Sequence, residues 1–394
     1  MLLTLSKECI GSDSNLVYDG NTWKWSDDVS PESILWGFDN PRDIRSAARS
    51  LRLEISDFTS TPWGNVQSVI RPNPTNTPWS HCVPTAMWKK HVSAMAEQLW
   101  IHFNNSNNLY YTTTHLRNRE IIGSLKQSAI NLSMLDKKIA CESKNNQHAL
   151  SKFRPEKGDL CPRSKYSLSG TVTGRMTVSH GPNILTMKKE DRAIFKSRMK
   201  RGRIAEIDLG SAEPRVALAM FGKSIDGDIY KKIAQTVNLT IDRDIAKIAT
   251  LSAIYGASHH TLKSKLSSDS DARKVLDLVR EYFGVRHLEA MLHEQHDSLG
   301  YITNTHGRKI FSETPSVNHL IQSSTVDVAF DVFELLLARS QELKIRINPI
   351  YLIHDAIIVD VHEDDYSKLV SICDKGFWSE ILKINFPVSV KEIK

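Results

Sequence analysis

The stretch INPIYLIHDAIIVDV, residues 347–361, decides the fold class of this chain. It contains two apolar runs rich in β-branched residues, and only His354 and Asp355 separate them. This pattern predicts a β-hairpin with those two residues at its tip. Residues 316–341, upstream of it, have the length and apolar spacing of a long helix. Strands and long helices together indicate an α+β protein.

A third strand-like run, RIAEIDLG at residues 203–210, carries Asp208 near its end. Alone, an aspartate at a strand end is more often a turn residue than a metal ligand. If this strand lies beside the hairpin, however, Asp208 and Asp355 meet at one place. Magnesium prefers hard oxygen ligands and keeps bound waters, so two carboxylates suffice for a two-cation phosphoryl-transfer site.

The segment RDIAKIATLSAIYG, residues 243–256, is predicted to be a helix with a cationic face. Four of its side chains recur every four residues: Arg243, Lys247, Leu251 and Tyr255. Residues at this spacing share one face of a helix. The cations can neutralise a triphosphate, and the tyrosine can stack on an incoming base. In isolation the same pattern would describe a solvent-facing Arg/Lys pair and a core tyrosine. Together with the aspartates it indicates a template-directed nucleotidyl transferase.

Composition agrees with a globular protein that binds a polyanion. The chain has 394 residues, a net charge of +6 and 40% apolar residues, which allows a large core in two or three subdomains. A basic run, KSRMKRGR at residues 196–203, precedes Asp208. Five scattered cysteines without a CxxC pair indicate reduced thiols. Because the sequence contains neither a secretory signal nor a membrane span, we expect a cytoplasmic protein.

Residues 1–84 say least about chemistry. Seven of the eight tryptophans fall within the first 100 residues, so we expect this region to fold or dock. A Pro-rich stretch at 71–84 has the composition of an extended connector. Apolar stripes over 88–103 and around 116–140 predict a pair of antiparallel helices.

Taken together, these segments resemble family A DNA polymerases. Three of them resemble the core motifs A, B and C of that family: DLGSAEPR (208–215), RDIAKIATLSAIYG (243–256) and IHDAIIV (353–359). Three more resemble other family segments: TGRMT (173–177), GYITNTHGR (300–308) and NHLIQSSTVD (318–327). The composite is specific because order and spacing agree, although each piece alone is weak.

The resemblance implies an α+β right-hand fold with an antiparallel-sheet palm, helical fingers and a helical thumb. The implied boundaries follow the motifs: 1–84 as an N-terminal segment of unknown role, 85–165 as a thumb-like helical region, 166–225 as the first part of the palm, 226–300 as the fingers, and 301–394 as the second part of the palm.

The resemblance also implies the catalytic residues. Asp208 and Asp355 would hold two Mg²⁺ ions, for which Mn²⁺ can substitute. Arg243 and Lys247 would bind the triphosphate, with Lys247 as the general acid for pyrophosphate.

Further residues would hold the nucleotide and the DNA. Tyr255 and Leu251 would lie near the new base pair, and Glu213 would close the space beside C2′ and exclude ribonucleotides. The primer–template end would be read in the minor groove by three polar side chains and positioned by a fourth: Arg175, Asn318 and Gln322, with His354 at the primer terminus.

Two departures from the family pattern affect expected rates. Motif C has Ala356 where the family usually has Glu, which removes an auxiliary carboxylate. Motif B has Leu251 where the family usually has Phe or Tyr, so we expect slower insertion and poor use of dideoxynucleotides. The short interval between motifs A and B suggests trimmed fingers.

The implied function is DNA-directed DNA synthesis, in replication or repair. No D-x-E opening precedes the two predicted helices, so we expect no 3′–5′ exonuclease in this polypeptide. The small size suggests a phage protein acting in a host cytoplasm. Its partners would be primer–template DNA and dNTPs, without a membrane. A separate exonuclease, helicase or processivity factor is left open.

Two alternatives stay open at this point. A single-subunit RNA polymerase shares the Arg/Lys/Tyr-Gly pattern of motif B and the His-Asp of motif C, whereas Glu213 and TGRMT favour a DNA polymerase. A degenerate, polymerase-like nucleic-acid-binding subunit would explain Ala356 and Leu251, although the intact aspartates speak against it.

Overall fold

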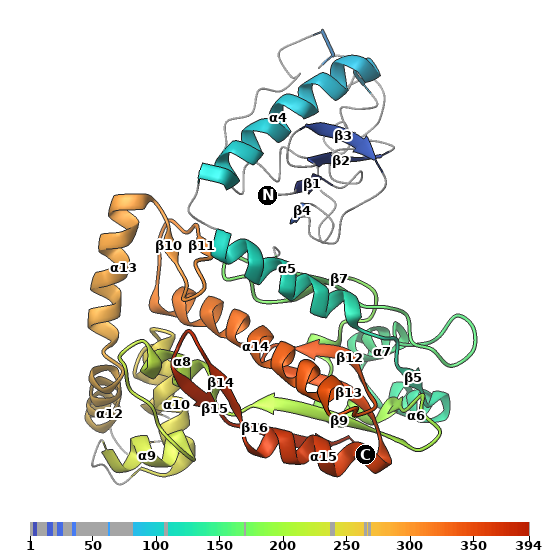
Figure 1. Cartoon of the computed structure of the whole chain (residues 1–394). Helices are drawn as coiled ribbons and strands as arrows, with labels where there is room; N and C mark the ends of the chain where they lie inside the picture. Colours follow the sequence, from blue (N-terminus) through green and yellow to red (C-terminus); the bar gives the residue numbers. More distant parts are fainter. Residues whose placement is uncertain are drawn as a thin grey trace. The chain divides into compact units, whose positions relative to one another are not determined.

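The computed structural model describes residues 3–5, 14–18, 22–26, 34–36, 62–63, 82–105, 109–168, 171–236, 241–263, 266 and 269–393. The chain divides into two compact units, Met1–Arg119 and Glu120–Lys394. Among the described residues, no helix has the length and apolar character needed to cross a membrane. Most elements of both units are labelled in Figure 1.

The first unit contains a small sheet and a long helix. The sheet has the order β3-β2-β1-β4 and comprises Leu3–Leu5 (β1), Asn15–Tyr18 (β2), Trp23–Ser26 (β3) and Ile34–Trp36 (β4). Helix α4 spans Thr85–Asn105, which confirms the helix predicted over 88–103. Trp88 is buried in a cluster with Leu5 and Leu16, so this tryptophan serves a core. The connector predicted at 71–84 lies almost entirely outside the described residues.

The second unit is built around a four-stranded antiparallel sheet with the order β12-β13-β9-β16. Its strands are Gly202–Leu209 (β9), Ile347–Ile353 (β12), Ala356–His362 (β13) and Val388–Glu392 (β16). Strands β12 and β13 form the predicted hairpin, with His354 and Asp355 at the turn. The three strands expected from the sequence are therefore confirmed, and the mixed α+β class with them.

Helices α14 (Val317–Glu342) and α15 (Glu363–Asp374) contribute to the core of this sheet. The predicted long helix is α14, and the hydroxyl of Ser316 caps its start by accepting a hydrogen bond from the amide of His319. Helix α15 packs against β9, β13 and β16. Phe330 and Phe333 of α14 are fully buried in the same cluster as the sheet strands. This packing fixes the sheet edge where β9 ends and β13 begins.

A second apolar cluster is almost entirely helical. It is formed largely by α8 (Ala212–Ala219), α9 (Ile229–Thr236), α10 (Arg243–Ile254), α11 (His260–Lys263), α12 (Asp269–Tyr282) and α13 (Val285–Leu299). Helix α10 is the predicted motif B helix. The carboxylate of Asp242 caps it at 2.7 Å from the amide of Ile245, and Gly256 follows it with a φ of 68°. Such a left-handed residue ends a helix.

The helix predicted around 116–140 is wrong. The chain forms α5 (Leu109–Ser124), then strand β5 (Ala129–Ile130), then α6 (Leu132–Cys141). Strand β5 pairs with β8 (Phe195–Lys196), and the side chain of Asn131 caps α6. The apolar stripe persists across the break because β5 and α6 face the same core. The apolar periodicity therefore did not reveal the break before α6, where Asn131 caps the new helix.

The remaining elements are short. They are α7 (Lys144–Ser151), β6 (Lys165–Ser167), β7 (Thr177–His180), the 3-10 helices η3 (Ile184–Thr186) and η4 (Lys189–Ile194), β10 (Ile302–Thr303), β11 (Lys309–Ile310), β14 (Phe377–Ser379) and β15 (Ile384–Phe386). The boundary between the two units lies within the range 85–165 that was predicted as a thumb. The division into thumb, palm and fingers stays a prediction.

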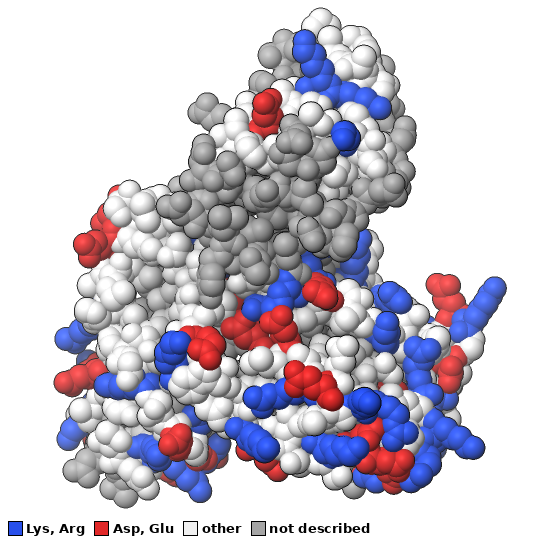
Figure 2. Space-filling model, viewed as in Figure 1, with Lys and Arg blue, Asp and Glu red and all other residues white. Residues whose placement is uncertain are grey.

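The basic run at 196–203 is largely engaged in ion pairs within the protein. Lys196 pairs with Asp159 at 2.8 Å, and Arg203 pairs with Glu363 at 2.9 Å. Figure 2 shows Lys and Arg side chains interleaved with Asp and Glu on the displayed face. Much of the positive charge of this run is therefore paired with acidic residues of the same chain. The run is consequently weaker evidence for a DNA-binding surface.

Candidate active site

The register of the central strands brings Asp208 and Asp355 together. Ala356, the first residue of β13, lies directly opposite Asp208 of β9. The amide of Leu209 donates to the backbone carbonyl of Asp355 at 3.1 Å. The two aspartates, far apart in the chain, thus lie at the same end of neighbouring antiparallel strands.

Both carboxyl groups have a raised pKa. Burial is the largest cause for Asp355, and the neighbouring charge of Asp208 adds to it, so that its pKa is about 7. Burial also raises the pKa of Asp208, together with the charge of Glu206. Two half-buried carboxylates side by side are costly to ionise without a cation.

This donor set fits divalent cations. Within the described part of the chain, no three His, Cys, Asp or Glu side chains form a group that could hold a metal ion. Magnesium does not require one, because it keeps several waters and is commonly bound through one or two carboxylates. Asp208 and Asp355 would hold such ions, and bound cations would offset the burial and the neighbouring negative charge that raise the two pKa values.

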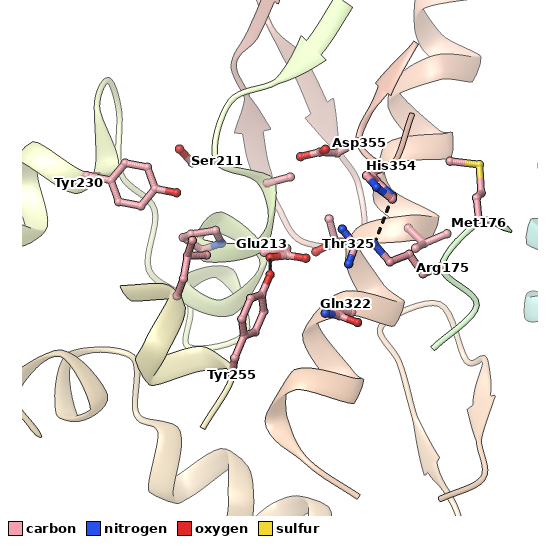
Figure 3. A pocket seen from close by; sticks show the side chains of 14 residues that line it. Arg175, Met176, Ser211, Glu213, Tyr230, Tyr255, Gln322, Thr325, His354 and Asp355 are labelled. Carbon is pink, nitrogen blue, oxygen red and sulfur yellow. Dashed lines mark hydrogen bonds between the residues drawn. The ribbon is translucent and has the colours of Figure 1, made fainter. Parts of the chain in front are cut away.

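A cavity of about 170 Å³ lies beside Asp355. Figure 3 shows its lining side chains, which converge from six parts of the second unit. They include residues of the 171–176 loop, the start of α8, α9, the end of α10, the middle of α14 and the β12–β13 turn: Arg175, Met176, Ser211, Glu213, Tyr230, Leu251, Tyr255, Gln322, Thr325, His354 and Asp355. Seven residues proposed from the sequence therefore share one cavity.

His354 and Arg175 contact each other at the edge of the cavity. The Nε of Arg175 donates to the Nδ1 of His354 at 3.2 Å (Figure 3). Burial and the charge of Arg175 lower the pKa of His354 to about 4. The imidazole is consequently neutral at pH 7 and can accept the hydrogen bond. His354 also has a φ of 53°, which a non-glycine residue adopts only when its surroundings hold it there.

Glu213 and Tyr255 form a second contact pair. Glu213 lies in the first turn of α8, and Tyr255 follows the last residue of α10. The Tyr255 hydroxyl donates to a carboxylate oxygen of Glu213. Burial and the nearby Glu213 carboxylate both raise the pKa of Tyr255. The contact joins the strand β9 side of the cavity to the motif B helix.

Arg243 and Lys247 do not line this cavity. Arg243 pairs with Asp228 at 2.6 Å, and its guanidinium lies 5.3 Å from the ring centroid of Tyr230. Lys247 is exposed one turn further along α10. The predicted cationic face exists, but its two charges lie outside the described lining.

Asn318 and Gln322 lie one turn apart on α14, as predicted, and only Gln322 lines the cavity. The side-chain oxygen of Asn318 is buried and has no hydrogen-bond partner among the described residues. A buried amide oxygen in this state usually has a missing partner such as water or a ligand.

Seven lining residues were not proposed from the sequence: Met176, Ser211, Ala212, Pro214, Tyr230, Thr325 and Val326. Ser211 stands within the quoted motif A run, and its φ of 54° shows the sharp strand-to-helix turn that presents it. Met176 and Thr325 also lie inside quoted segments. Tyr230 has no sequence signal, because only the packing of α9 brings it to the cavity.

A pair of carboxylates at the ends of adjacent antiparallel strands, beside a cavity flanked by helices, fits the class of metal-dependent phosphoryl-transfer enzymes. The family comparison makes the class specific. The profile of DNA polymerase family A matches residues 137–392, and the chain belongs to this family. Its domain is therefore that of a DNA-directed nucleotidyltransferase. A comparison with curated proteins gives no match.

Proposed function

We propose that this chain extends the 3′-end of a DNA primer with dNTPs on a DNA template, using two Mg²⁺ ions at Asp208 and Asp355. The observation that carries the proposal is the paired aspartates with raised pKa values at the joined ends of β9 and β13. When bound, the ions would activate the 3′-oxygen and offset charge on the triphosphate. The two aspartates would position these ions, because the paired strands β9 and β13 fix where their carboxylates lie.

The cavity supports a nucleotide site. Glu213 would exclude a 2′-hydroxyl, because its carboxylate is tied to Tyr255 and cannot swing aside freely. Tyr255 would present its ring to the nascent base pair, and Leu251 would pack beside it. Arg243 and Lys247 would bind the triphosphate from α10, with Lys247 donating a proton to pyrophosphate.

The opposite side of the cavity would hold the primer–template end. Arg175 and Gln322 line it, and Asn318 lies one turn away on α14. The N–H groups of these three side chains can donate to the acceptors common to all base pairs in the minor groove. His354, held neutral beside Arg175, would position the primer terminus.

The wider context of the activity is also part of the proposal. We infer the palm at 166–225 and 301–394, the fingers at 226–300, the thumb within 85–165, and an N-terminal segment at 1–84 with no assigned role. We further propose a phage replication or repair role in which any exonuclease, helicase or processivity factor is a separate protein.

A primer-extension assay tests the proposal. Wild-type protein is incubated with a primed DNA template, Mg²⁺ and either dNTPs or rNTPs. Template-directed extension with dNTPs and little with rNTPs is the expected result. Extension with rNTPs would instead support an RNA polymerase, and no extension with Mg²⁺ or Mn²⁺ would support a non-enzymatic DNA-binding subunit.

A further inference from the structure

The two cations on α10 have different surroundings. Arg243 contacts the carboxylate of Asp228 through Nε at 2.6 Å. For Lys247, which is exposed, no ion pair is seen within the part of the chain that the structure describes. An ion pair with Asp228 therefore holds Arg243, one of the two proposed triphosphate ligands, and Lys247, the other, lies in solvent.

The Asp228 side chain also caps helix α9, and these hydrogen bonds hold it in place. Its Oδ1 accepts hydrogen bonds from the amides of Tyr230 at 3.0 Å and Lys231 at 3.2 Å, which caps the start of α9. Its Oδ2 faces Arg243. Because one oxygen is fixed by the helix, the other is a rigid anion presented to the guanidinium.

Tyr230 connects this pair to the nucleotide cavity. Its ring lines the cavity, and the Arg243 guanidinium lies 5.3 Å from the centroid of the same ring. The Tyr230 side chain is thus shared between the cavity lining and the surroundings of Arg243. An arginine side chain has several rotatable bonds, so release from Asp228 would let the guanidinium move past the ring.

We propose that Asp228 is a latch that competes with the incoming nucleotide for Arg243. The inference rests on the proposed function, in which Arg243 binds the triphosphate. The triphosphate must displace the Asp228 carboxylate before it gains this cation, so the latch weakens the apparent affinity for dNTP. Asp228 is then a residue that sets nucleotide affinity without contacting the reacting atoms.

The test is Asp228→Asn in steady-state single-nucleotide primer extension. Asparagine keeps the oxygen that caps α9, because it is as good an N-cap as aspartate, and removes only the charge. The side chains of the pair are 45% and 32% exposed, so the competition is modest. We expect KM for dNTP to fall about twofold to fivefold, with kcat within about twofold of wild type.

Two further variants make the test specific. Asp244→Asn removes a carboxylate that is 85% exposed and 3.7 Å from the same guanidinium, and it should leave KM unchanged. In an Arg243→Ala background, Asp228→Asn should no longer lower KM, because nothing remains to be released.

The outcomes separate the latch from the polymerase proposal. If wild type extends primers but Asp228→Asn leaves KM unchanged or raises it, the latch is wrong and the polymerase proposal stands. An equal fall in KM in the Arg243→Ala background would also overturn the latch. If wild type extends no primer, both proposals fail together.

Discussion

The hydroxyl of Tyr255, at the end of α10, donates a hydrogen bond to the carboxylate of Glu213, in the first turn of α8. The contact joins the segment that carries motif A to the helix that carries motif B. It also fixes the Glu213 carboxylate at the wall of the cavity. A side chain that is restrained in this way can act as a steric barrier, whereas a freely rotating glutamate could yield to a ligand.

Removing the barrier should relax sugar selection. For Glu213→Ala we expect the ratio of rNTP to dNTP incorporation to rise by about 10-fold to 200-fold, the range that a small steric group in a binding site provides. Competitive single-nucleotide insertion measures it. Tyr255→Phe is the matched control, because it removes the hydrogen bond and keeps the ring; it should raise the ratio less than Glu213→Ala does. Equal ratios for wild type and Glu213→Ala would remove Glu213 from this role.

Leu251 lines the cavity one turn before Tyr255 and offers no aromatic surface. For Leu251→Tyr we expect faster dNTP insertion and a gain in dideoxynucleotide use of about tenfold, since stacking and hydroxyl contacts are each of the order of 1 kcal/mol. Chain-terminator incorporation in parallel reactions measures this. Terminator use that is the same in both proteins would contradict the assignment of position 251.

Gly174, the residue before Arg175, has a left-handed backbone and lies against Arg308. Gly174 has a φ of 74°, and a Cβ placed there would overlap the guanidinium of Arg308, which donates to the carbonyl of Leu168 at 3.0 Å. For Gly174→Ala we expect a loss of stability of about 1–3 kcal/mol from the backbone strain and from the lost hydrogen bond of Arg308, whose guanidinium would have to move. We also expect a lower extension rate, because a change of backbone at position 174 would shift Arg175.

Gly222→Ala is the control for that substitution. Its φ of 63° is similar, but a Cβ there would meet no atom within 4 Å. Chemical denaturation of both variants isolates the effect of Arg308. If Gly222→Ala were as destabilising and as inactive as Gly174→Ala, the crowding at Arg308 would play no part.

The raised pKa of Asp355 predicts how stability depends on pH. Its pKa is about 7 in the folded chain against 3.8 for an ordinary aspartate, so between these two pH values the folded state holds a proton that the unfolded state has lost. The stability of the metal-free protein should therefore fall as pH rises from about 4 to 7, by up to about 4 kcal/mol from this group.

Asp355→Asn should remove that penalty. In metal-free denaturation at pH 8 we expect the variant to be more stable than wild type, and the difference should shrink toward pH 4. Added Mg²⁺ should stabilise wild type and not the variant. A difference between the two proteins that is independent of pH would show that Asp355 is not the group responsible.

The sequence predicted the catalytic edge of the sheet well because local signals coincide there. Two apolar runs separated by His354 and Asp355 marked β12 and β13, a third run carrying Asp208 marked β9, and the four-residue spacing from Arg243 to Tyr255 marked α10. The break between α5 and α6 was missed, because an apolar stripe does not reveal a change from helix to strand when both bury the same side chains.

Electrostatic pairing was the other limit. The sequence shows that Arg243 and Lys247 share a helix face. Asp228, however, lies 15 positions before Arg243, at the start of helix α9, and only the packing of α9 against α10 brings the two side chains together. The partners of the basic run are more distant still in the chain, as with Asp159 for Lys196 and Glu363 for Arg203. Charge clusters in a sequence therefore indicate a partner less securely than strand-end aspartates indicate a metal site.

The most direct test of the central claim is single-nucleotide primer extension with Mg²⁺ by wild type, Asp208→Asn and Asp355→Asn. Asp374→Asn, which changes an exposed acid at the end of α15, is the control. We expect each of the first two substitutions to lower the extension rate at least about a hundredfold, with folding intact, and the control to match wild type. Extension at the wild-type rate by either Asp208→Asn or Asp355→Asn would contradict the two-carboxylate site.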